Sequence, residues 1–215
     1  MLAQDTILTV TLTIGVPKPI GYQKIAIIGN SIVQSPPKFQ ENIHWLNAWG
    51  MAATEAHLDW AHQLWALLAA KYGAVPELMV RNFDLPRALD PALIAPLDRD
   101  VRNFVPDLMI VQVAESLPAN DENYAFALGR FFDLSIDSGA AVMLLTMWYP
   151  DSGQNAIIRK VTAERGGVVV NISDLYEDPQ YHGNADREYP DAPVGTHPGD
   201  AGMQEIARRV IAALP

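Results

Sequence analysis

Two short stretches, far apart in the chain, carry residues that could do nucleophilic chemistry. Ser31 directly follows the apolar run 25–28 and the pair Gly29-Asn30, and His197 stands just before the last apolar run with helical spacing. A serine hydroxyl is a weak nucleophile at its free pKa and needs a base, and histidine is the side chain whose pKa lies near neutrality. Ser31 and His197 are therefore candidates for a nucleophile and its base.

The segment before Ser31 predicts where its hydroxyl would lie. Four consecutive apolar residues, 25–28, are typical of a strand buried on both faces, as in the middle of a parallel sheet. Gly29 permits a sharp turn at the end of this strand. Ser31 would then stand at the carboxyl end of the strand, where open α/β sheets bind their ligands. The alternative is that Ser31 only caps the following segment, because serine is a favoured N-cap residue.

Apolar runs and amphipathic segments alternate along the rest of the chain. Further strands are predicted at residues 76–82, 107–113, 141–147 and 168–172, and helices at residues 52–72, 98–104, 121–137, 156–165 and 204–214. Strands that alternate with helices at this spacing pair in parallel through crossover helices. The sequence therefore predicts an α/β protein, a three-layer α/β/α sandwich around a mostly parallel five-stranded sheet.

Residues 5–14 predict a separate strand with one solvated face, because β-branched and apolar side chains partly alternate with Thr. A linker rich in Gly and Pro follows this strand. We therefore divide the chain into an N-terminal β arm with its linker, residues 1–22, and an α/β domain, residues 23–215. The arm fits an edge strand, the remnant of a preceding β-domain or a partner-binding arm equally well.

Composition limits the classes of function. The net charge of -10 argues against a nucleic-acid partner and disfavours a polyanionic substrate, because no basic patch can neutralise phosphates. The absence of cysteine excludes disulfides and thiolate catalysis. No apolar run approaches the ~20 residues that span a bilayer, and residues 1–5 do not resemble a signal peptide. These features leave the compartment and the oligomeric state open.

The only grouping of metal-ligand residue types is His182, Asp186 and Asp191 in a polar loop, and its spacing matches no metal motif. We expect neither a metal nor another cofactor.

The two stretches around Ser31 and His197 together resemble the SGNH (GDSL-like) hydrolases. The first motif of that family reads Gly-Asp-Ser and its last reads Asp-x-x-His-Pro; this chain has Gly29-Asn30-Ser31 and, at 194–198, Val-Gly-Thr-His-Pro. The resemblance covers residues 23–215 and is to a bacterial branch with Gly-Asn-Ser. It implies a flavodoxin-like α/β/α fold in which Ser31 attacks an ester carbonyl and His197 accepts its proton.

The family also supplies hydrogen-bond donors to the oxyanion from a Gly after the second strand and an Asn after the third. Asp84 stands at the first of these positions, where a backbone N–H remains available. Ser116 stands at the second and carries a hydroxyl donor. Asn120 is a further donor in the same loop. We therefore expect Asp84 and Ser116 to contribute to an oxyanion site.

Val194 stands where the family has the Asp of its catalytic triad. Asp191 is the candidate replacement if its loop bulges toward the site, and a main-chain carbonyl is the alternative partner for the imidazole. The resemblance therefore implies either a Ser-His dyad or an altered triad. A Val194→Asp substitution should raise turnover if the loop keeps its shape.

Related branches act as esterases on small acyl groups, including acetyl groups on carbohydrates. Trp45 and Trp49 lie in the segment after Ser31 and are candidates for substrate contact, with core packing an equal alternative. We therefore expect a serine esterase acting on a small-molecule or carbohydrate ester. The alternative is a catalytically weak or inactive module that binds a glycan or acyl ligand.

Overall fold

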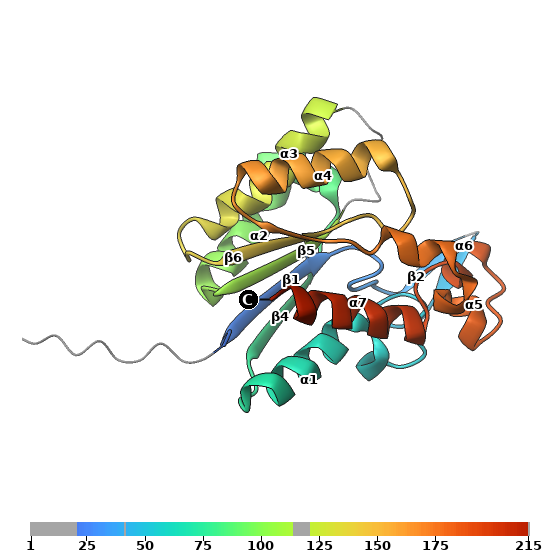
Figure 1. Cartoon of the computed structure of the whole chain (residues 1–215). Coiled ribbons are helices and arrows are strands. Elements are labelled where there is room, and N and C mark those ends of the chain that lie inside the picture. The colour runs from blue at the N-terminus through green and yellow to red at the C-terminus, as the bar shows by residue number, and fades with distance from the viewer. Residues whose placement is uncertain (1–20, 41, 114–120, 215) are drawn as a thin grey trace, which may run out of the picture.

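A computed structural model of the chain describes residues 21–40, 42–113 and 121–214 (Figure 1). Its centre is a parallel sheet of five strands in the order β4-β1-β5-β6-β7. These strands are β1 (Lys24–Gly29), β4 (Glu77–Asn82), β5 (Leu108–Gln112), β6 (Ala141–Leu145) and β7 (Val168–Val170). The predicted parallel sheet is confirmed, with each strand within two residues of its expected ends.

Helices cover both faces of the sheet (Figure 1). One face carries α1 (Trp60–Tyr72) and α7 (Asp200–Ala213), and the other carries α2 (Pro91–Phe104), α3 (Asp121–Ser135) and α4 (Ser152–Glu164). Two short helices, α5 (Gly183–Asp186) and α6 (Ala192–Gly195), lie between β7 and α7, together with short 3-10 turns. The predicted three-layer α/β/α sandwich is therefore confirmed.

The central strand β1 shows why its sequence is apolar without interruption. Ile25 and Ile27 pack into the core beneath α1 and α7, whereas Ala26 and Ile28 pack into the core beneath the other helices. All four side chains are fully buried. Successive residues of a strand point to opposite faces, so a strand covered on both sides must be apolar at every position.

The helix predicted at residues 52–72 begins later than expected. Its N-cap is Asp59, whose side chain accepts a hydrogen bond from the N–H of His62, while residues 56–58 form a separate 3-10 turn. The helix buries Trp60, Ala61, Leu64 and Leu68, whereas Trp65 is 36% exposed. The Asp59 cap fixes where α1 begins.

The helix predicted at residues 98–104 begins earlier than expected, at Pro91. The Asp90 side chain caps it through the N–H of Ala92, and a proline is favoured in the first helical turn. The segment after Ser31, for which no element was predicted, contains a small antiparallel hairpin, β2 (Lys38–Gln40) and β3 (Ile43–Trp45).

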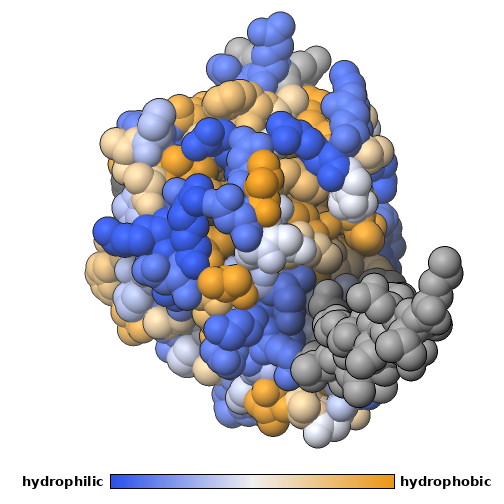
Figure 2. All heavy atoms as spheres, turned by 90° about the vertical axis from the view of Figure 1, so that its left-hand side faces the viewer, coloured by the Kyte–Doolittle hydropathy of each residue, from blue (hydrophilic) through white to orange (hydrophobic). Residues whose placement is uncertain are grey.

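The predicted β arm at residues 5–14 lies outside the described residues, as do Ser116 and Asn120. Within the described part of the chain, no helix is long and apolar enough to cross a membrane, and no group of acidic or histidine residues is arranged to hold a metal ion. The side of the molecule at the amino ends of the strands shows hydrophobic residues in small groups between hydrophilic ones (Figure 2).

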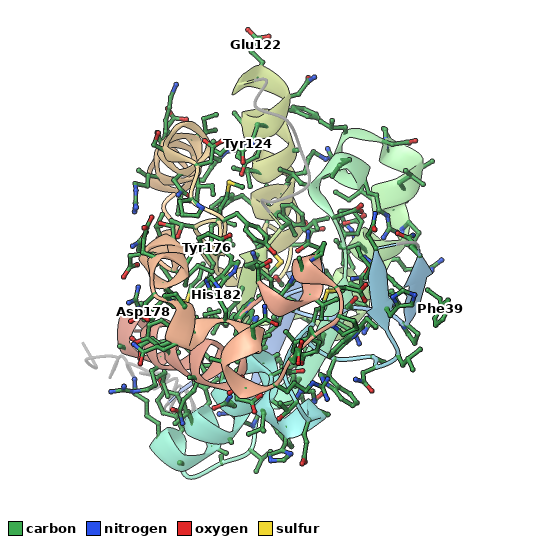
Figure 3. All side chains as sticks on the ribbon, turned by 90° about the vertical axis from the view of Figure 1, so that its right-hand side faces the viewer. Phe39, Glu122, Tyr124, Tyr176, Asp178 and His182 are labelled. Atoms are coloured by element: carbon green, nitrogen blue, oxygen red, sulfur yellow. The ribbon has the colours of Figure 1, made fainter. Side chains whose placement is uncertain are left out.

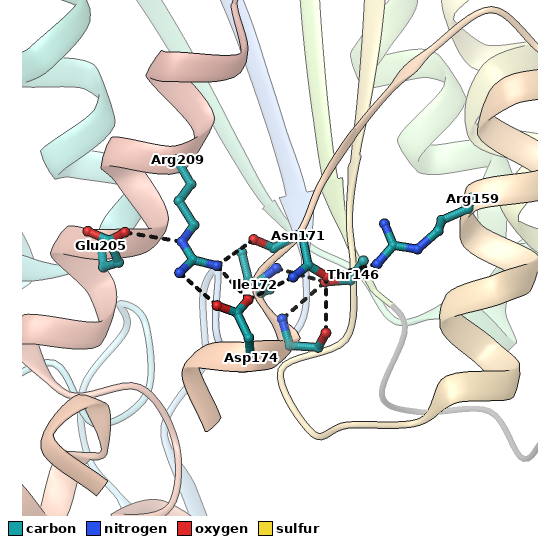
Figure 4. A network of polar contacts seen from close by, with 8 residues as sticks. Thr146, Arg159, Asn171, Ile172, Asp174, Glu205 and Arg209 are labelled. Atoms are coloured by element: carbon teal, nitrogen blue, oxygen red, sulfur yellow. Dashed lines mark hydrogen bonds and ion pairs between the residues drawn. The ribbon is translucent and has the colours of Figure 1, made fainter. Parts of the chain in front are cut away.

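A polar network ties α7 to the carboxyl ends of β6 and β7 (Figure 4). Arg209 of α7 donates to the Asp174 carboxylate at 2.6 and 2.9 Å and to the carbonyl of Asn171 at 2.9 Å. The Thr146 hydroxyl accepts from the N–H of Ile172 at 2.8 Å. These contacts hold α7, and with it the segment before α7 that carries His197, against the sheet.

Candidate active site

Ser31 and His197 meet at the carboxyl end of β1. The Ser31 Oγ lies 2.9 Å from the His197 Nε2. Ser31 lies in the turn that follows β1, in which the N–H groups of Val33 and Gln34 donate to the carbonyl of Asn30. The chain packs too closely at Gly29 for a side chain, since a Cβ there would collide with the carbonyl of Gln112 and the side chain of Val33. His197 is held three residues before α7. The two residues that the sequence singled out as nucleophile and base are thus within hydrogen-bond distance.

The second ring nitrogen of His197 faces a main-chain carbonyl. Nδ1 lies 2.5 Å from the Pro193 carbonyl oxygen and 3.2 Å from the Tyr149 hydroxyl. A lone pair on Nδ1 would face the carbonyl lone pairs at this short distance, so Nδ1 carries the hydrogen and donates to Pro193. Nε2 is then the unprotonated nitrogen, and it accepts from the Ser31 hydroxyl. This is the tautomer that a general base requires.

The environment of His197 favours its neutral form. The residue is 8% exposed. Burial lowers the pKa of His197 to about 4; the Pro193 carbonyl opposes this effect and the charge of Lys38 adds to it. The ring is therefore neutral near pH 7 and ready to accept a proton.

Asp191, the candidate triad acid, binds another histidine. Its carboxylate accepts from the N–H of His44 at 2.8 Å and lies 2.9 Å from the His44 Nδ1. Among the described residues it forms no hydrogen bond or ion pair with His197. Asp191 instead connects the β2–β3 hairpin to α6, the helix that contains Pro193. The loop therefore lacks the bulge that Asp191 would need to reach the imidazole, and the alternative partner, a main-chain carbonyl, lies beside Nδ1.

Val194 points into a small apolar cluster with Trp45, Met51 and Ala52, and it is fully buried. A carboxylate placed on this side chain would lie in the cluster without a solvent shell. The burial of Val194 argues against the expectation that Val194→Asp raises turnover, which stays a prediction to be measured.

The two tryptophans differ in their surroundings. Trp45 is 2% exposed and belongs to the core cluster, so of its two alternatives core packing holds and substrate contact does not. Trp49 is partly buried, packs edge-on against Trp45 and donates its indole N–H to the carbonyl of Ala53. Its placement supports packing more than ligand contact.

A pocket of about 340 Å³ lies beside Ser31. It is lined by Asn30, Ser31, Lys38, Asn82, Asp84 and Arg87. Among the described residues, the backbone N–H groups of Ser31 and Asp84 have no hydrogen-bond acceptor. Asp84 lines the pocket between the end of β4 and the 3-10 turn η2 (Leu85–Leu89). These are the N–H groups that an oxyanion beside Ser31 would need.

Tyr149 packs against the His197 ring, and Tyr176 and His182 extend this aromatic group. The ring centroid of Tyr149 lies 5.9 Å from that of His197 and 5.3 Å from that of Tyr176, which in turn lies 4.8 Å from His182. Figure 3 looks onto this side of the molecule: Tyr176 and His182 lie together, well apart from Phe39 on the hairpin.

Sequence reasoning missed four residues at this site: Lys38, Arg87, Tyr149 and Pro193. Tyr149 follows the carboxyl end of β6, a position that could have marked it as a site residue. Pro193 acts through its main-chain oxygen, for which no side-chain pattern exists.

No family model and no curated protein matches this chain. Solved structures do match. A two-domain esterase (CEX) active on acetylated mannans has a TM-score of 0.58 at 16% identity, with 88% of this chain and 48% of that chain covered. The psychrotrophic esterase EstA from Pseudoalteromonas sp. has a TM-score of 0.59 at 12% identity, with 89% and 96% covered. A putative GDSL-like lipase from Bacteroides ovatus has a TM-score of 0.57 at 15% identity, with 88% and 97% covered.

The fold is that of the SGNH (GDSL-like) esterases. The chain spans about half the length of the two-domain mannan esterase, at 48%, and nearly the whole length of the two single-domain matches. Identities this low establish the shared fold and leave the chemistry to be argued from the site.

Proposed function

We propose that this SGNH-fold protein is a serine esterase that hydrolyses small acyl esters, acetyl groups on carbohydrates among them. The observation that supports it most is the hydrogen bond of 2.9 Å between Ser31 and His197, with Nε2 as the acceptor, at the carboxyl end of the central strand. A partly exposed serine next to a buried histidine that is held in the basic tautomer is arranged for nucleophilic catalysis.

The proposed reaction has two halves. The Ser31 oxygen attacks the ester carbonyl carbon while its proton passes to the His197 Nε2. The tetrahedral intermediate collapses, the C–O bond to the alcohol breaks, and His197 returns the proton to the departing alcohol oxygen. Water then attacks the acyl-Ser31 ester with His197 again as base, which releases the carboxylic acid and restores the enzyme.

The developing oxyanion would accept hydrogen bonds from the N–H groups of Ser31 and Asp84, two residues that line the pocket. Losing one such donor typically costs about 10²–10³ in turnover. The Asp84 carboxylate lies 3.8 Å from the Arg87 Nε, which offsets its negative charge. Ser116, outside the described residues, stays a proposed further donor.

The imidazole would work as part of a dyad that a carbonyl completes. The Pro193 oxygen orients the ring and selects the tautomer, which are two of the tasks of the triad carboxylate. Because it is neutral, it stabilises the imidazolium less than a carboxylate would. We therefore propose a base that is correctly oriented but weak, and slow turnover.

The proposed substrate class rests on the structural similarity to a mannan esterase and on the volume of the pocket beside Ser31. The two-domain mannan esterase acts on acetylated mannans, and a pocket of about 340 Å³ has the volume for one small ring with its acyl group.

The test is hydrolysis of 4-nitrophenyl acetate by the purified chain. We expect Ser31→Ala and His197→Ala each to remove turnover, and the exposed Ser152→Ala on α4 to leave it unchanged. Turnover by Ser31→Ala equal to that of the wild type would overturn the proposal. The alternative function, a module that binds glycan or acyl ligands without chemistry, requires that wild type and Ser31→Ala are equally inactive.

A further inference from the structure

The pocket beside Ser31 has two cationic side chains in its wall. Lys38 comes from β2 of the hairpin and Arg87 from the 3-10 turn after β4. The hairpin and this turn are far apart in the chain, and the fold brings them together next to the proposed nucleophile. A neutral ester does not require either charge.

The two cationic side chains differ in whether a carboxylate lies within ion-pair distance. Arg87 lies with its Nε 3.8 Å from the Asp84 carboxylate and stacks its guanidinium 4.6 Å from the centroid of the Phe83 ring. Lys38 has no carboxylate within ion-pair distance among the described residues. Asp84 lines the same pocket, but its described ion pair is with Arg87 and not with Lys38. In a chain with 25 acidic and 15 basic residues, a lysine without an ion pair among the described residues, next to the proposed nucleophile, suggests a binding role.

The charge of Lys38 also acts against the proposed chemistry. It lies close enough to lower the pKa of His197, which weakens the imidazole as a base. An anionic group bound to Lys38 would cancel this charge and raise the pKa of His197, although burial, the larger cause of its lowering, would remain. A substrate with such a group would therefore strengthen the base as it binds.

We propose that Lys38, supported by Arg87, forms a carboxylate-binding subsite beside Ser31, so that the preferred substrates are small esters that carry one carboxylate in addition to the scissile ester. This inference rests on the proposed esterase function and names its substrate class. The net charge of -10 disfavours long anionic polymers at a distance, whereas one carboxylate is held by direct contact in the pocket.

The subsite is tested with two pairs of esters that differ in charge. In the first pair, 4-acetoxybenzoate and its methyl ester, the carboxylate is on the leaving alcohol. In the second pair, monophenyl succinate and phenyl methyl succinate, it is on the acyl group. For each pair the ratio of kcat/KM for the anionic ester to kcat/KM for the neutral ester is measured in the wild type, Lys38→Met and Lys38→Gln.

We expect this ratio to fall about fivefold in both Lys38 variants for at least one pair, which is the size of a partly exposed charge contact. Lys160→Met, an exposed lysine on α4, removes the same charge elsewhere and should leave the ratio unchanged. The pair that responds shows whether the subsite lies on the alcohol or the acyl side. A ratio that is unchanged in both pairs, or that falls equally in Lys160→Met, overturns the inference.

A binding measurement separates this inference from the esterase proposal. Calorimetry with the Ser31→Ala variant should detect tighter binding of one carboxylate-bearing ester than of its neutral partner, and Lys38→Met in that background should remove the difference. If hydrolysis depends on Ser31 but no charge preference is found, only the subsite is wrong. If no ester is hydrolysed and the binding preference is present, only the esterase proposal fails.

Discussion

The His197 Nδ1 lies 2.5 Å from the main-chain carbonyl oxygen of Pro193. A peptide oxygen thus occupies the place beside the ring where a hydrolase triad has a carboxylate. The contact fixes the tautomer and orientation of the imidazole without adding a negative charge. We expect turnover, its pH dependence and the stability of the folded chain to reflect this neutral partner of the imidazole.

The first prediction concerns the pH dependence of hydrolysis. His197 must be neutral to act as a base, and its pKa is lowered to about 4. We therefore expect kcat/KM for a neutral ester to be constant from pH 7 down to about pH 5 and to fall below about pH 4. A limb centred near the ordinary histidine value of ~6.5 or above would contradict this environment.

The second prediction concerns stability in the same range. The unfolded chain protonates His197 near pH 6.5, whereas the folded chain does so only at about pH 4. The unfolded state therefore binds more protons between these values, and stability falls as the pH is lowered. This group should contribute a loss of about 3 kcal/mol by pH 4. Urea unfolding of wild type and His197→Gln between pH 7 and 4 measures it; equal slopes would contradict the prediction.

The third prediction concerns Lys38 and the base. The Lys38 ammonium disfavours the imidazolium, so Lys38→Met should raise the pKa of His197 and move the acid limb with neutral esters to higher pH. Lys160→Met is the matched control for net charge and should leave the limb in place. A limb that moves equally in both variants would show a general field effect instead.

The fourth prediction concerns Asp191. Its carboxylate binds His44 and connects the hairpin to α6, so it positions Pro193 and does not touch His197. Asp191→Asn should lower kcat/KM less than tenfold, well short of the ~10⁴ associated with a triad carboxylate. It should also cost about 1 kcal/mol of stability. His44→Phe should reproduce both effects, and a double variant should add little. A loss near 10⁴ in Asp191→Asn alone would restore the altered triad.

The fifth prediction concerns Val194. Val194→Asp places a carboxylate in the apolar cluster of Trp45, Met51 and Ala52. We expect a loss of about 3 kcal/mol of stability and no gain in turnover. Val194→Thr has the same shape without the charge and should cost less. Higher turnover in Val194→Asp would show that the carboxylate reaches the imidazole.

The sequence was sufficient for the layers and for the pair Ser31 and His197. Residues 25–28 of β1 form an unbroken apolar run that marks a central strand. Ser31 was singled out because it follows this strand, and His197 because it precedes the last helix. The sequence did not predict features that depend on a single contact. The Asp59 cap moved the start of α1, and the hairpin at 38–45 has too few residues for a periodic signal. Asp191 was a reasonable acid by distance along the chain, but the fold directs it to His44. A carbonyl partner such as Pro193 leaves no trace in the sequence.

The central claim is that Ser31 is a nucleophile activated by a neutral, carbonyl-oriented His197. Its most direct test is covalent labelling with a fluorophosphonate, followed by intact-mass measurement and peptide mapping. We predict one adduct per chain, located on Ser31, absent in Ser31→Ala and strongly slowed in His197→Ala. Labelling should persist at pH 5, where an ordinary histidine is mostly protonated. No adduct on Ser31 at neutral pH, or an adduct that forms at the same rate in His197→Ala, would contradict the account.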